Sequence, residues 1–243
     1  MQLIKLSATP STNTYLKELM GEMNLVDFTV VSAKNQTHGR GQRDSTWDSE
    51  GGKNLTFSIL KKNIQLNLSD SFLISIVVPL AIIEVLNELG IPKVKIKWPN
   101  DILSCDLKIG GILIENTVIG VKVSRSVIGI GLNVNQKSFN GVAHASSISK
   151  IIGKDFDLEP LLTQLLNKLE YRLNSLASIH KDELFKEYHE HLFRKGEKSQ
   201  FLDTNNNPFY GYITGITPEG LLKVETEKDG QKVFGLKEIK LNY

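Results

Sequence analysis

Three short stretches of this sequence gather residues that could bind or polarise an anionic substrate. The first is GRGQRDSTWDSEGGKN, from Gly39 to Asn54. Its glycines let backbone N–H groups approach an anion closely, while Arg40, Arg43 and Lys53 can neutralise the anion's charge. The loop is therefore expected to hold a phosphate or a carboxylate. A solvated, flexible loop without a ligand is the competing interpretation.

The second stretch is KWPNDILSCDLKIGGILIE, residues 97–115. Trp-Pro after a strand predicts a rigid exit from a sheet, which would aim Asn100 and Asp101 at one place. Lys108 precedes a pair of glycines ending at Gly111, and these would leave room for a ligand beside the lysine. Taken alone, the stretch is equally typical of an ordinary polar hairpin.

The third stretch is GIGLNVN, residues 129–135, in which glycines interrupt an apolar strand that ends in asparagines such as Asn133. Alone it is typical of a barrel corner or a turn. It gains weight only beside the other two stretches.

Secondary structure can be assigned around these stretches from spacing and capping residues. A helix capped by Ser11, Thr12 and Asn13 is expected to end at Gly21. The glycine-rich loop is expected between two strands, and a long apolar helix capped by Ser69-Asp70 is expected to be kinked or split at Pro79. The other expected elements are strands at 28–33, 55–59, 94–98, 109–118 and 126–134 and helices at 157–176 and 182–193. The first of these helices is expected to start at Asp157 and Pro160, because leucines then recur three and four residues apart up to Leu176.

The length and composition indicate a folded protein with one large and one small domain. The chain has 243 residues, of which 40% are hydrophobic. After Gly196, short alternating segments with turn signals predict about five strands. We expect a domain at residues 1–193 and a small β domain at 194–243.

Charge and cysteine content exclude several classes of protein. A net charge of +2 is too small for a general nucleic-acid binder. The single cysteine, Cys105, excludes an internal disulfide and a cysteine-rich zinc site. His189 and His191 are two residues apart and so point to different faces of a helix, which argues against a metal site there.

The sequence is typical of a cytoplasmic protein. The N-terminus lacks the long apolar stretch and the cleavage site of a secretory signal. The most apolar run, residues 72–86, is shorter than the roughly 20 residues of a membrane span. We expect it to be a buried core helix, and we expect no membrane partner.

In combination, four stretches resemble the biotin protein ligases in their order and separation. They are STN at a helix start, GRGQR…W…GGKNLTFS, KWPND…K-IGGILIE and GIGLNVN. The resemblance covers residues 11–135, and the later helices and small β domain also suit the family. It implies an α+β fold of the class II synthetase-like type. Such a fold has a mixed, largely antiparallel sheet with packed helices, followed by a small SH3-like β-barrel.

The resemblance also implies a reaction in two steps. Biotin attacks the α-phosphate of MgATP through its carboxylate to give biotinyl-5′-AMP, and a lysine of a biotin carboxyl carrier domain then takes the biotin. The implied cosubstrate is ATP with Mg²⁺, and no metal site built by the protein is expected. A glycine-rich loop that closes over the adenylate would shield it from water. The oligomeric state stays open between monomer and homodimer.

Site residues follow by position from the resemblance. Lys108, Arg40 and Asp101 are the implied catalytic residues; Lys108 would bridge carboxylate and phosphate oxygens, and Asp101 would orient or deprotonate the incoming amine. The implied biotin-binding residues are Ser11, Thr12, Asn13, Gln36, Arg40, Gly41, Gln42, Lys108 and Gly111. The implied ATP- and adenylate-binding residues are Arg43, Trp47, Lys97, Asn100 and Asn133.

The sequence departs from the family pattern at several positions. Gln42 stands where many members carry arginine, and Asp44 and Ser45 stand where glycine and a basic residue are frequent. These differences remove positive charge from the loop. The C-terminal segment also lacks an arginine that could reach the ATP phosphates, for which Lys237 or Lys240 could substitute.

Three other functions compete with this interpretation. A lipoate-protein ligase shares the fold and the chemistry but carries a different arginine- and glycine-rich signature. A repressor that binds biotinyl-AMP needs a helix-turn-helix domain, for which the residues before Ser11 leave no room, so no DNA partner is expected. A non-catalytic nucleotide-binding module would bind ATP without releasing pyrophosphate.

Overall fold

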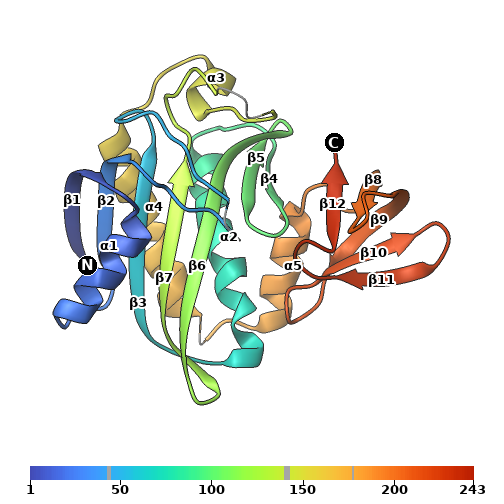
Figure 1. Cartoon of the computed structure of the whole chain (residues 1–243), viewed down its shortest axis with the longest axis horizontal. Coiled ribbons are helices and arrows are strands. Elements are labelled where there is room, and N and C mark those ends of the chain that lie inside the picture. The colour runs from blue at the N-terminus through green and yellow to red at the C-terminus, as the bar shows by residue number, and fades with distance from the viewer. Residues whose placement is uncertain (43–44, 140–142, 177) are drawn as a thin grey trace.

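A computed structural model of the chain describes residues 1–42, 45–139, 143–176 and 178–243, and its strands form two separate sheets (Figure 1). The larger one, the main sheet, is mixed: β1 and β2 are parallel and all other neighbours are antiparallel. Its strands lie in the spatial order β1 (Gln2–Thr9), β2 (Thr29–Gln36), β3 (Leu55–Asn67), β7 (Lys122–Leu132), β6 (Leu107–Ile119), β5 (Asp101–Ser104) and β4 (Val94–Lys97).

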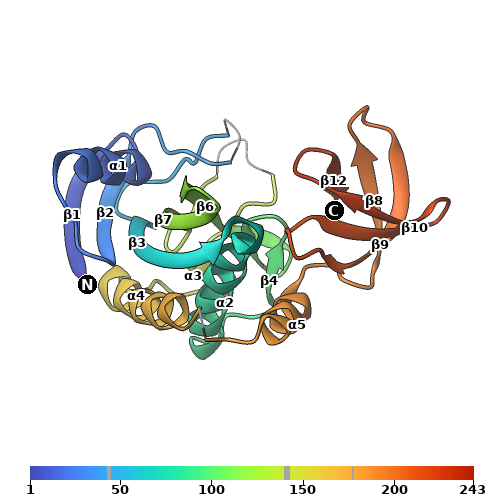
Figure 2. The same cartoon turned by 90° about the horizontal axis from the view of Figure 1, so that it is seen from below.

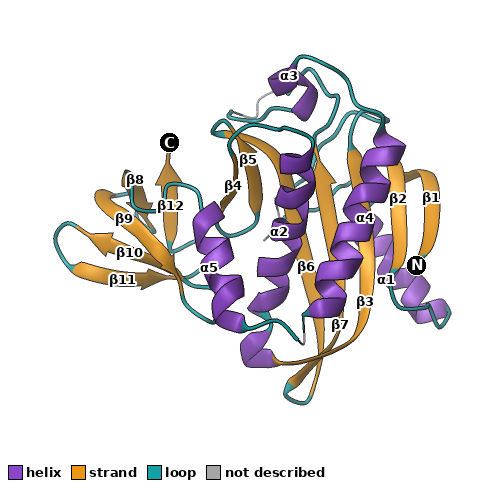
Figure 3. Ribbon diagram, turned by 180° about the vertical axis from the view of Figure 1, so that it is seen from behind, coloured by secondary structure: helices purple, strands orange, loops and turns teal. Residues whose placement is uncertain are grey.

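Helices cover both faces of the main sheet unequally. One face is covered by α2 (Phe72–Glu88), α4 (Leu158–Ser175) and α5 (Lys181–His191) (Figure 3). The opposite face carries α1 (Thr12–Glu22) over the strands at the β1 end (Figure 2). Two short helical segments, η1 (Leu68–Asp70) and α3 (Ile148–Ile152), complete the fold.

The core lies between the main sheet and the three-helix layer. Helix α2 is surrounded by α4, α5 and the sheet, and most of its side chains are buried. This environment explains why its sequence is apolar on nearly all sides. The stretch Leu68–Glu88 has the length and mean hydropathy, 2.0, to cross a membrane by composition alone, but 61% of it is buried inside this protein. Helix α4 instead buries only the leucine face predicted from its three- and four-residue spacing.

The smaller sheet, the C-terminal sheet, is entirely antiparallel and lies beside α5 (Figure 1). Two contacts join it to the rest of the chain near one turn. The Trp98 indole N–H donates to the Gly220 carbonyl at 2.8 Å, and the Phe72 ring occupies the space where a side chain at position 220 would lie. Its strands lie in the order β11 (Gly230–Phe234), β10 (Leu222–Thr226), β9 (Pro208–Ile216), β8 (Lys198–Asp203) and β12 (Ile239–Asn242).

A histidine also fastens the C-terminal sheet to α5. His189 Nε2 accepts the backbone N–H of Ile216 at 3.1 Å, so the ring must carry no proton on that nitrogen. Burial lowers the pKa of His189, and the nearby Lys195 and Lys223 lower it further. The neutral ring that this bond requires is therefore the favoured form.

The predicted fold class is confirmed: the protein is α+β, with a mixed, largely antiparallel main sheet, packed helices and a small five-stranded β unit. Besides η1, three elements escaped prediction. Strand β1 is an edge strand whose side chains are mostly exposed, β5 has only four residues, and α3 is a single short turn. None of them produces the sustained hydrophobic periodicity on which the sequence-based assignment depends.

Two expectations about helix α2 were wrong. Ser69 and Asp70 do not cap it: they belong to η1, the helix starts at Phe72, and Asp70 accepts an ion pair from Lys181 instead. Of the two outcomes expected at Pro79, the split is wrong, because α2 continues through this residue to Glu88, while the kink stays a prediction.

Candidate active site

A cavity of about 790 Å³ lies where the glycine-rich loop, the N-terminus of α1, the β4–β5 turn and the C-terminal sheet meet. It brings together residues that are far apart in the sequence. The site residues expected from the sequence that line it are Ser11, Thr12, Asn13, Gln36, Arg40, Gly41, Gln42, Trp47, Lys97, Asn100, Asp101, Lys108 and Gly111. Lys237 and Lys240 from the C-terminal sheet line it as well.

A buried group of polar side chains forms one end of this cavity, and we call it the polar cluster: Thr12, Asn13, Gln36 and Ser58. Gln36 Oε1 accepts both the backbone N–H and the hydroxyl of Thr12, at 2.8 and 3.0 Å. Gln36 thus caps the first turn of α1 from strand β2. The expected cap by the helix's own residues is wrong, because Ser11 makes no side-chain capping bond.

Within the polar cluster, Ser58 lies between Thr12 and Asn13. Its hydroxyl lies 2.7 Å from Thr12 Oγ1 and 2.5 Å from Asn13 Oδ1. A hydroxyl has one proton, so it can donate to only one of these oxygens at a time. The cluster therefore keeps free hydrogen-bonding capacity next to the cavity, which suits a ligand with both donors and acceptors.

A glycine makes room for this arrangement. Gly129 on β7 pairs with Ser58 on β3, directly beneath Asn13. A Cβ atom at this position would lie 3.0 Å from Asn13 Cγ and would overlap Asn13 Oδ1. Only glycine at position 129 lets the Asn13 amide lie against the sheet.

The charged centre of the cavity consists of one carboxylate between two lysines. Lys108 Nζ lies 2.7 Å from Asp101 Oδ1, and Lys97 Nζ lies 3.5 Å from Asp101 Oδ2. Lys108 also lies over the Trp47 ring, with Nζ 5.7 Å from the ring centroid. Asp101 therefore fixes the position of the Lys108 ammonium group in the cavity.

The turn between β4 and β5 is stitched to β6. The Asn100 side chain donates to the Ile112 carbonyl at 2.8 Å, and the Ile112 N–H donates to the Asn100 carbonyl at 3.0 Å. The expected rigid exit from the sheet is present, with a cis peptide between Trp98 and Pro99. These two bonds fix the turn, so Asn100 places its neighbour Asp101.

The indole of Trp47 lies flat on a surface formed by two glycines. Cβ atoms at Gly111 on β6 and Gly131 on β7 would lie 3.1 Å from Trp47 Cζ3 and 2.7 Å from Trp47 Nε1. In the glycine-rich loop, the Gly41 N–H donates to the Ser45 carbonyl at 2.7 Å and the Trp47 N–H donates to the Gly39 carbonyl at 2.9 Å. Trp47 Nε1 is buried and has no hydrogen-bond partner among the described residues, so a ligand acceptor could bind there.

Asn133 and Arg43 differ from the other expected site residues. Asn133 is buried behind Lys108 and does not line the cavity: its Nδ2 donates to the Ser146 carbonyl at 3.0 Å, and its Oδ1 has no partner in the described part of the chain. The segment that contains Ser146 also contacts Lys108, whose backbone N–H donates to the His144 carbonyl at 2.7 Å. Arg43 and Asp44 lie outside the described residues.

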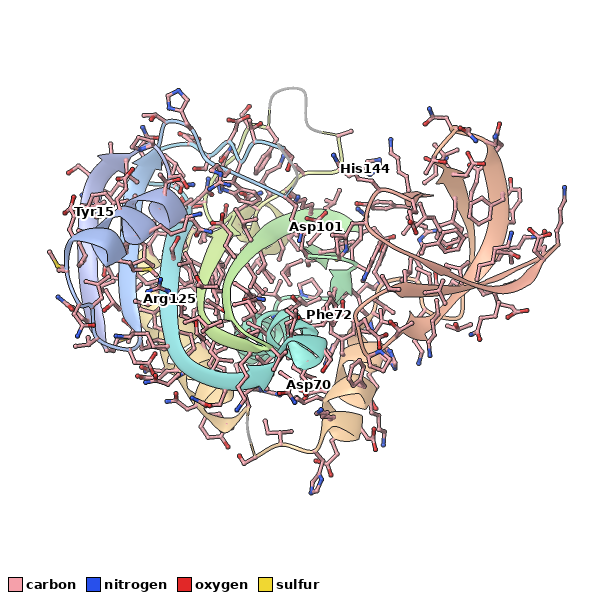
Figure 4. All side chains as sticks on the ribbon, turned by 60° about the horizontal axis from the view of Figure 1, so that its bottom comes forward. Tyr15, Asp70, Phe72, Asp101, Arg125 and His144 are labelled. Atoms are coloured by element: carbon pink, nitrogen blue, oxygen red, sulfur yellow. The ribbon has the colours of Figure 1, made fainter. Side chains whose placement is uncertain are left out.

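Tyr243 closes the cavity from the C-terminal side. Its ring centroid lies 5.1 Å from that of His144, and Lys97 Nζ lies 5.2 Å from the Tyr243 ring. Figure 4 shows His144 and Asp101 on the side of the molecule that faces the C-terminal sheet. Burial raises the pKa of Tyr243, and the carboxylates of Asp101 and Asp106 raise it further. The tyrosine is therefore neutral at physiological pH.

No group of three or more His, Cys, Asp or Glu side chains with the geometry of a metal site occurs within the described ranges. His189 is used in the bond to Ile216, and Cys105 is an exposed residue of the β5–β6 turn with a φ of 48°.

Sequence reasoning missed four residues that shape the cavity: Ser58, Glu115, Gly129 and Tyr243. Ser58 was visible only as a small residue that alternates with apolar ones in the predicted strand, and Glu115 only as the last letter of a quoted motif. Neither residue carries a local signal of function. Their roles depend on strand register, which pairs Ser58 with Gly129 and brings Glu115 beside Asn13.

Both the sequence and the structure of the chain are similar to those of known protein ligases. Residues 6–133 match the model of the biotin/lipoate A/B protein ligase family. Over 237 residues the chain is 29% identical to the bifunctional ligase/repressor BirA of Bacillus spizizenii, covering 96% of this chain and 72% of that relative. It is 28% identical to the biotin--[acetyl-CoA-carboxylase] ligase of Mycobacterium tuberculosis over 175 residues, which cover 71% of this chain and 64% of that one.

The structure resembles a solved ligase over nearly its whole length. The biotin protein ligase from Aquifex aeolicus, solved in complex with biotin and ATP, matches with a TM-score of 0.81 at 28% identity. The match covers 99% of this chain and 98% of that one, so it includes both sheets and all the segments that surround the cavity.

Proposed function

The chain belongs to the biotin/lipoate A/B protein ligase family, and from this premise we propose that it is a biotin protein ligase. It activates biotin with MgATP to biotinyl-5′-AMP and transfers the biotin to a lysine of a biotin carboxyl carrier domain. The relatives that are named for biotin, and the neighbour that holds biotin and ATP, support the assignment.

The polar cluster is the observation that favours biotin over lipoate. A ureido ring has two N–H donors and a carbonyl acceptor, whereas the dithiolane ring of lipoate has no hydrogen-bonding group of comparable strength. Thr12, Asn13, Gln36 and Ser58 are all at least partly buried and carry donors and acceptors that a ureido ring can satisfy. Lipoate offers no group to the hydrogen-bonding capacity that the cluster keeps beyond its internal bonds, so each bond that biotin makes there, worth about 0.5–1.5 kcal/mol, would be lost.

The first step requires two anions to approach each other. An oxygen of the biotin carboxylate forms a bond to the α-phosphorus of ATP, the bond from that phosphorus to the bridging oxygen breaks, and pyrophosphate leaves. We assign Lys108 to this centre, because an ammonium group held in place by Asp101 gains interaction energy as the two groups of oxygens come together. Arg40, which also lines the cavity, would support this from the loop.

Mg²⁺ would be held mainly by the ATP phosphates, since the described residues form no metal cage. When bound, it neutralises phosphate charge and stabilises the leaving pyrophosphate. Lys237 and Lys240 line the same cavity and would act on the phosphates from the C-terminal sheet. These two lysines would replace the arginine that the C-terminal segment lacks.

In the second step the acceptor lysine amine attacks the acyl carbon of biotinyl-AMP. The bond from that carbon to the AMP oxygen breaks, AMP leaves, and the amine nitrogen loses a proton. Asp101 remains our candidate to orient or deprotonate this amine. It can do so when the two lysines that contact its oxygens, Lys97 and Lys108, turn toward the nucleotide.

The other assigned residues divide between the two halves of the ligand. The backbone of Arg40, Gly41 and Gln42 would enclose the biotin tail, and Gly111, on which the Trp47 indole lies, would leave room beside Lys108. Trp47, Lys97, Asn100, Asn133 and Arg43 are assigned to the adenylate side. For Asn133 the support is its buried Oδ1 without a partner among the described residues, and for Asn100 it is the placement of Asp101.

We further propose residues 1–193 as the catalytic domain and 194–243 as a small SH3-like domain that forms one wall of the cavity. The acceptor is the carrier domain of a biotin-dependent carboxylase, and the reaction takes place in the cytoplasm. A relative named for acetyl-CoA carboxylase supports the class of acceptor.

The assignment is tested by incubating the protein with biotin, MgATP and a biotin carboxyl carrier domain and weighing the acceptor by mass spectrometry. One added biotin per carrier domain, absent without ATP and absent when the target lysine is replaced by arginine, is expected. An unmodified acceptor alongside normal ATP binding would instead indicate a nucleotide-binding module without ligase activity.

A further inference from the structure

We propose that Glu115 is a positioning residue that couples the polar cluster to the glycine-rich loop. This inference rests on the proposed function, because its consequences concern the binding of biotin and the retention of biotinyl-AMP. Glu115 lies on β6 and does not line the cavity, so it acts on the ligand through other side chains.

Three donors from two separate segments converge on the Glu115 carboxylate. Asn13 Nδ2 donates to Oε2 at 2.9 Å, and Lys17 Nζ donates to Oε1 at 2.8 Å. The Arg40 guanidinium lies 3.4 Å from Oε1. Asn13 belongs to the polar cluster, and Arg40 belongs to the glycine-rich loop, so one side chain contacts both walls of the biotin end of the cavity.

The ionised carboxylate is the nearer of two acceptors that set which way the Asn13 amide faces, the other being the Leu113 carbonyl at 3.4 Å from Nδ2. A carboxylate only accepts hydrogen bonds, so Asn13 must turn its N–H group toward Glu115 and its carbonyl oxygen toward Ser58. Burial raises the pKa of Glu115, but hydrogen bonds from Lys17 and Asn13 and the charges of Lys17 and Arg40 outweigh burial and hold it below its ordinary value. The orientation is therefore maintained throughout the neutral pH range.

The same carboxylate tethers the loop. Among the described residues, Arg40 forms its ion pair with Glu115, and about half of the Arg40 side chain is exposed to solvent. When the loop is docked, this pair holds Gly41 and Gln42 next to the polar cluster. Loss of the charge at position 115 would release the loop and disorder the Asn13 amide together.

Glu115→Gln tests the proposal with a side chain of the same shape. A glutamine has one acceptor oxygen and brings two N–H donors, so it cannot satisfy Asn13, Lys17 and Arg40 at once. We expect the KM for biotin to rise about tenfold, from the loss of a charge-assisted bond. Release of biotinyl-AMP should become about threefold faster, from the loss of a partly exposed ion pair.

The rate of pyrophosphate release at saturating biotin should fall by much less than the KM rises, by no more than about threefold, because Lys108 and Asp101 do not contact Glu115 and only the supporting Arg40 does. If Glu115 only stabilised the fold, its replacement would not raise KM for biotin while changing kcat so little. The release rate in wild type should also increase with ionic strength, since salt screens the Arg40–Glu115 pair, and Glu115→Gln should lose most of this salt dependence.

Two further variants separate the proposal from simple destabilisation. Lys17→Gln removes a partner of the same carboxylate that does not line the cavity, so its KM for biotin and its release rate should match wild type. Glu115→Asp keeps the charge and should recover part of both effects, although its shorter side chain cannot reach all three donors. Urea unfolding of each variant shows which of them are fully folded at the assay temperature.

The two proposals fail in different ways. If wild type does not form biotinyl-AMP from biotin and MgATP, the proposed function is wrong. If wild type forms it and a folded Glu115→Gln variant keeps the wild-type KM, release rate and salt dependence, only the role of Glu115 is wrong. Equal losses in Glu115→Gln and Lys17→Gln would also contradict that role, since they would reduce it to a general effect of surface charge.

Discussion

Replacing Gly129 by alanine is expected to close the biotin end of the cavity while leaving the nucleotide end intact. The added Cβ would lie 3.0 Å from Asn13 Cγ and would overlap Asn13 Oδ1. Asn13 cannot simply withdraw, because Glu115 holds its N–H group and Ser58 lies against its oxygen. One of these bonds must break, or strand β7 must move away from α1.

The size of the effect follows from the bonds involved. Breaking the charge-assisted bond between Asn13 and Glu115 costs about 1.5–3 kcal/mol. If that misplacement removes one good hydrogen bond to the ureido ring, biotin binding should weaken about tenfold to a hundredfold. Overpacking should also lower the free energy of unfolding by about 1–3 kcal/mol. Binding of ATP without biotin should be unchanged, because Gly129 lies at the polar cluster and not near Lys97 or Lys108.

The assay is isothermal titration of the folded variant with biotin and, separately, with MgATP. Gly21→Ala is the matched control: this glycine lies in α1, and no atom within 4 Å would meet its new Cβ. The control should bind biotin normally and be more stable by about 0.5–1 kcal/mol, because alanine favours a helix. Wild-type affinity for biotin in Gly129→Ala would refute our account of the polar cluster. Equal losses for biotin and ATP would refute it as well.

Three other changes test separate parts of the account. Lys108→Ala should slow biotin-dependent pyrophosphate release about a hundredfold to a thousandfold without changing stability, since removal of a group that stabilises the transition state costs about 2.7–4 kcal/mol; a wild-type rate would contradict its assignment. Gln42→Arg should slow the escape of biotinyl-AMP by up to about tenfold if the new charge contributes roughly 1.4 kcal/mol to the closed loop, as measured by dissociation of the preformed adenylate at matched salt. Equal rates would mean that closure depends on the loop glycines and Trp47. Because the pKa of His189 is lowered in the folded protein, its contribution to stability is complete above the ordinary value of 6.5 and is lost as the pH falls through the lowered value. Urea unfolding between pH 7.5 and pH 5 should therefore show a loss of stability that His189→Gln reduces, and an identical pH dependence in the variant would contradict the role of this bond.

The sequence was most informative where a feature is local. The leucine spacing of α4 and its Asp157 cap predicted that helix nearly to the residue, because both signals are contained in a few turns. Trp-Pro before Asn100 and Asp101 correctly predicted a fixed turn that aims Asp101 into the cavity. Most of the site residues assigned from the order of the motifs do line the cavity; Asn133 does not, and Arg43 lies outside the described residues.

Features that depend on tertiary register could not be found this way. The cap of α1 comes from Gln36 on another element, so no residue near Ser11 indicates it. Gly129 looked like a turn device, because its partner Asn13 is more than a hundred positions away in the chain. Glu115 acquires its three partners only when the sheet brings β6 beside both α1 and the glycine-rich loop.

The central claim is that this cavity joins biotin to AMP, and isotope exchange between pyrophosphate and ATP measures it most directly. Wild type should exchange label when biotin and Mg²⁺ are present, with no acceptor protein added, because formation of the adenylate is reversible while the product is held. Lipoate at the same concentration should support little or no exchange, since it cannot satisfy the polar cluster. Exchange that is equal with biotin and lipoate would contradict the assignment of the polar cluster. Absence of exchange with biotin would contradict the proposed function itself.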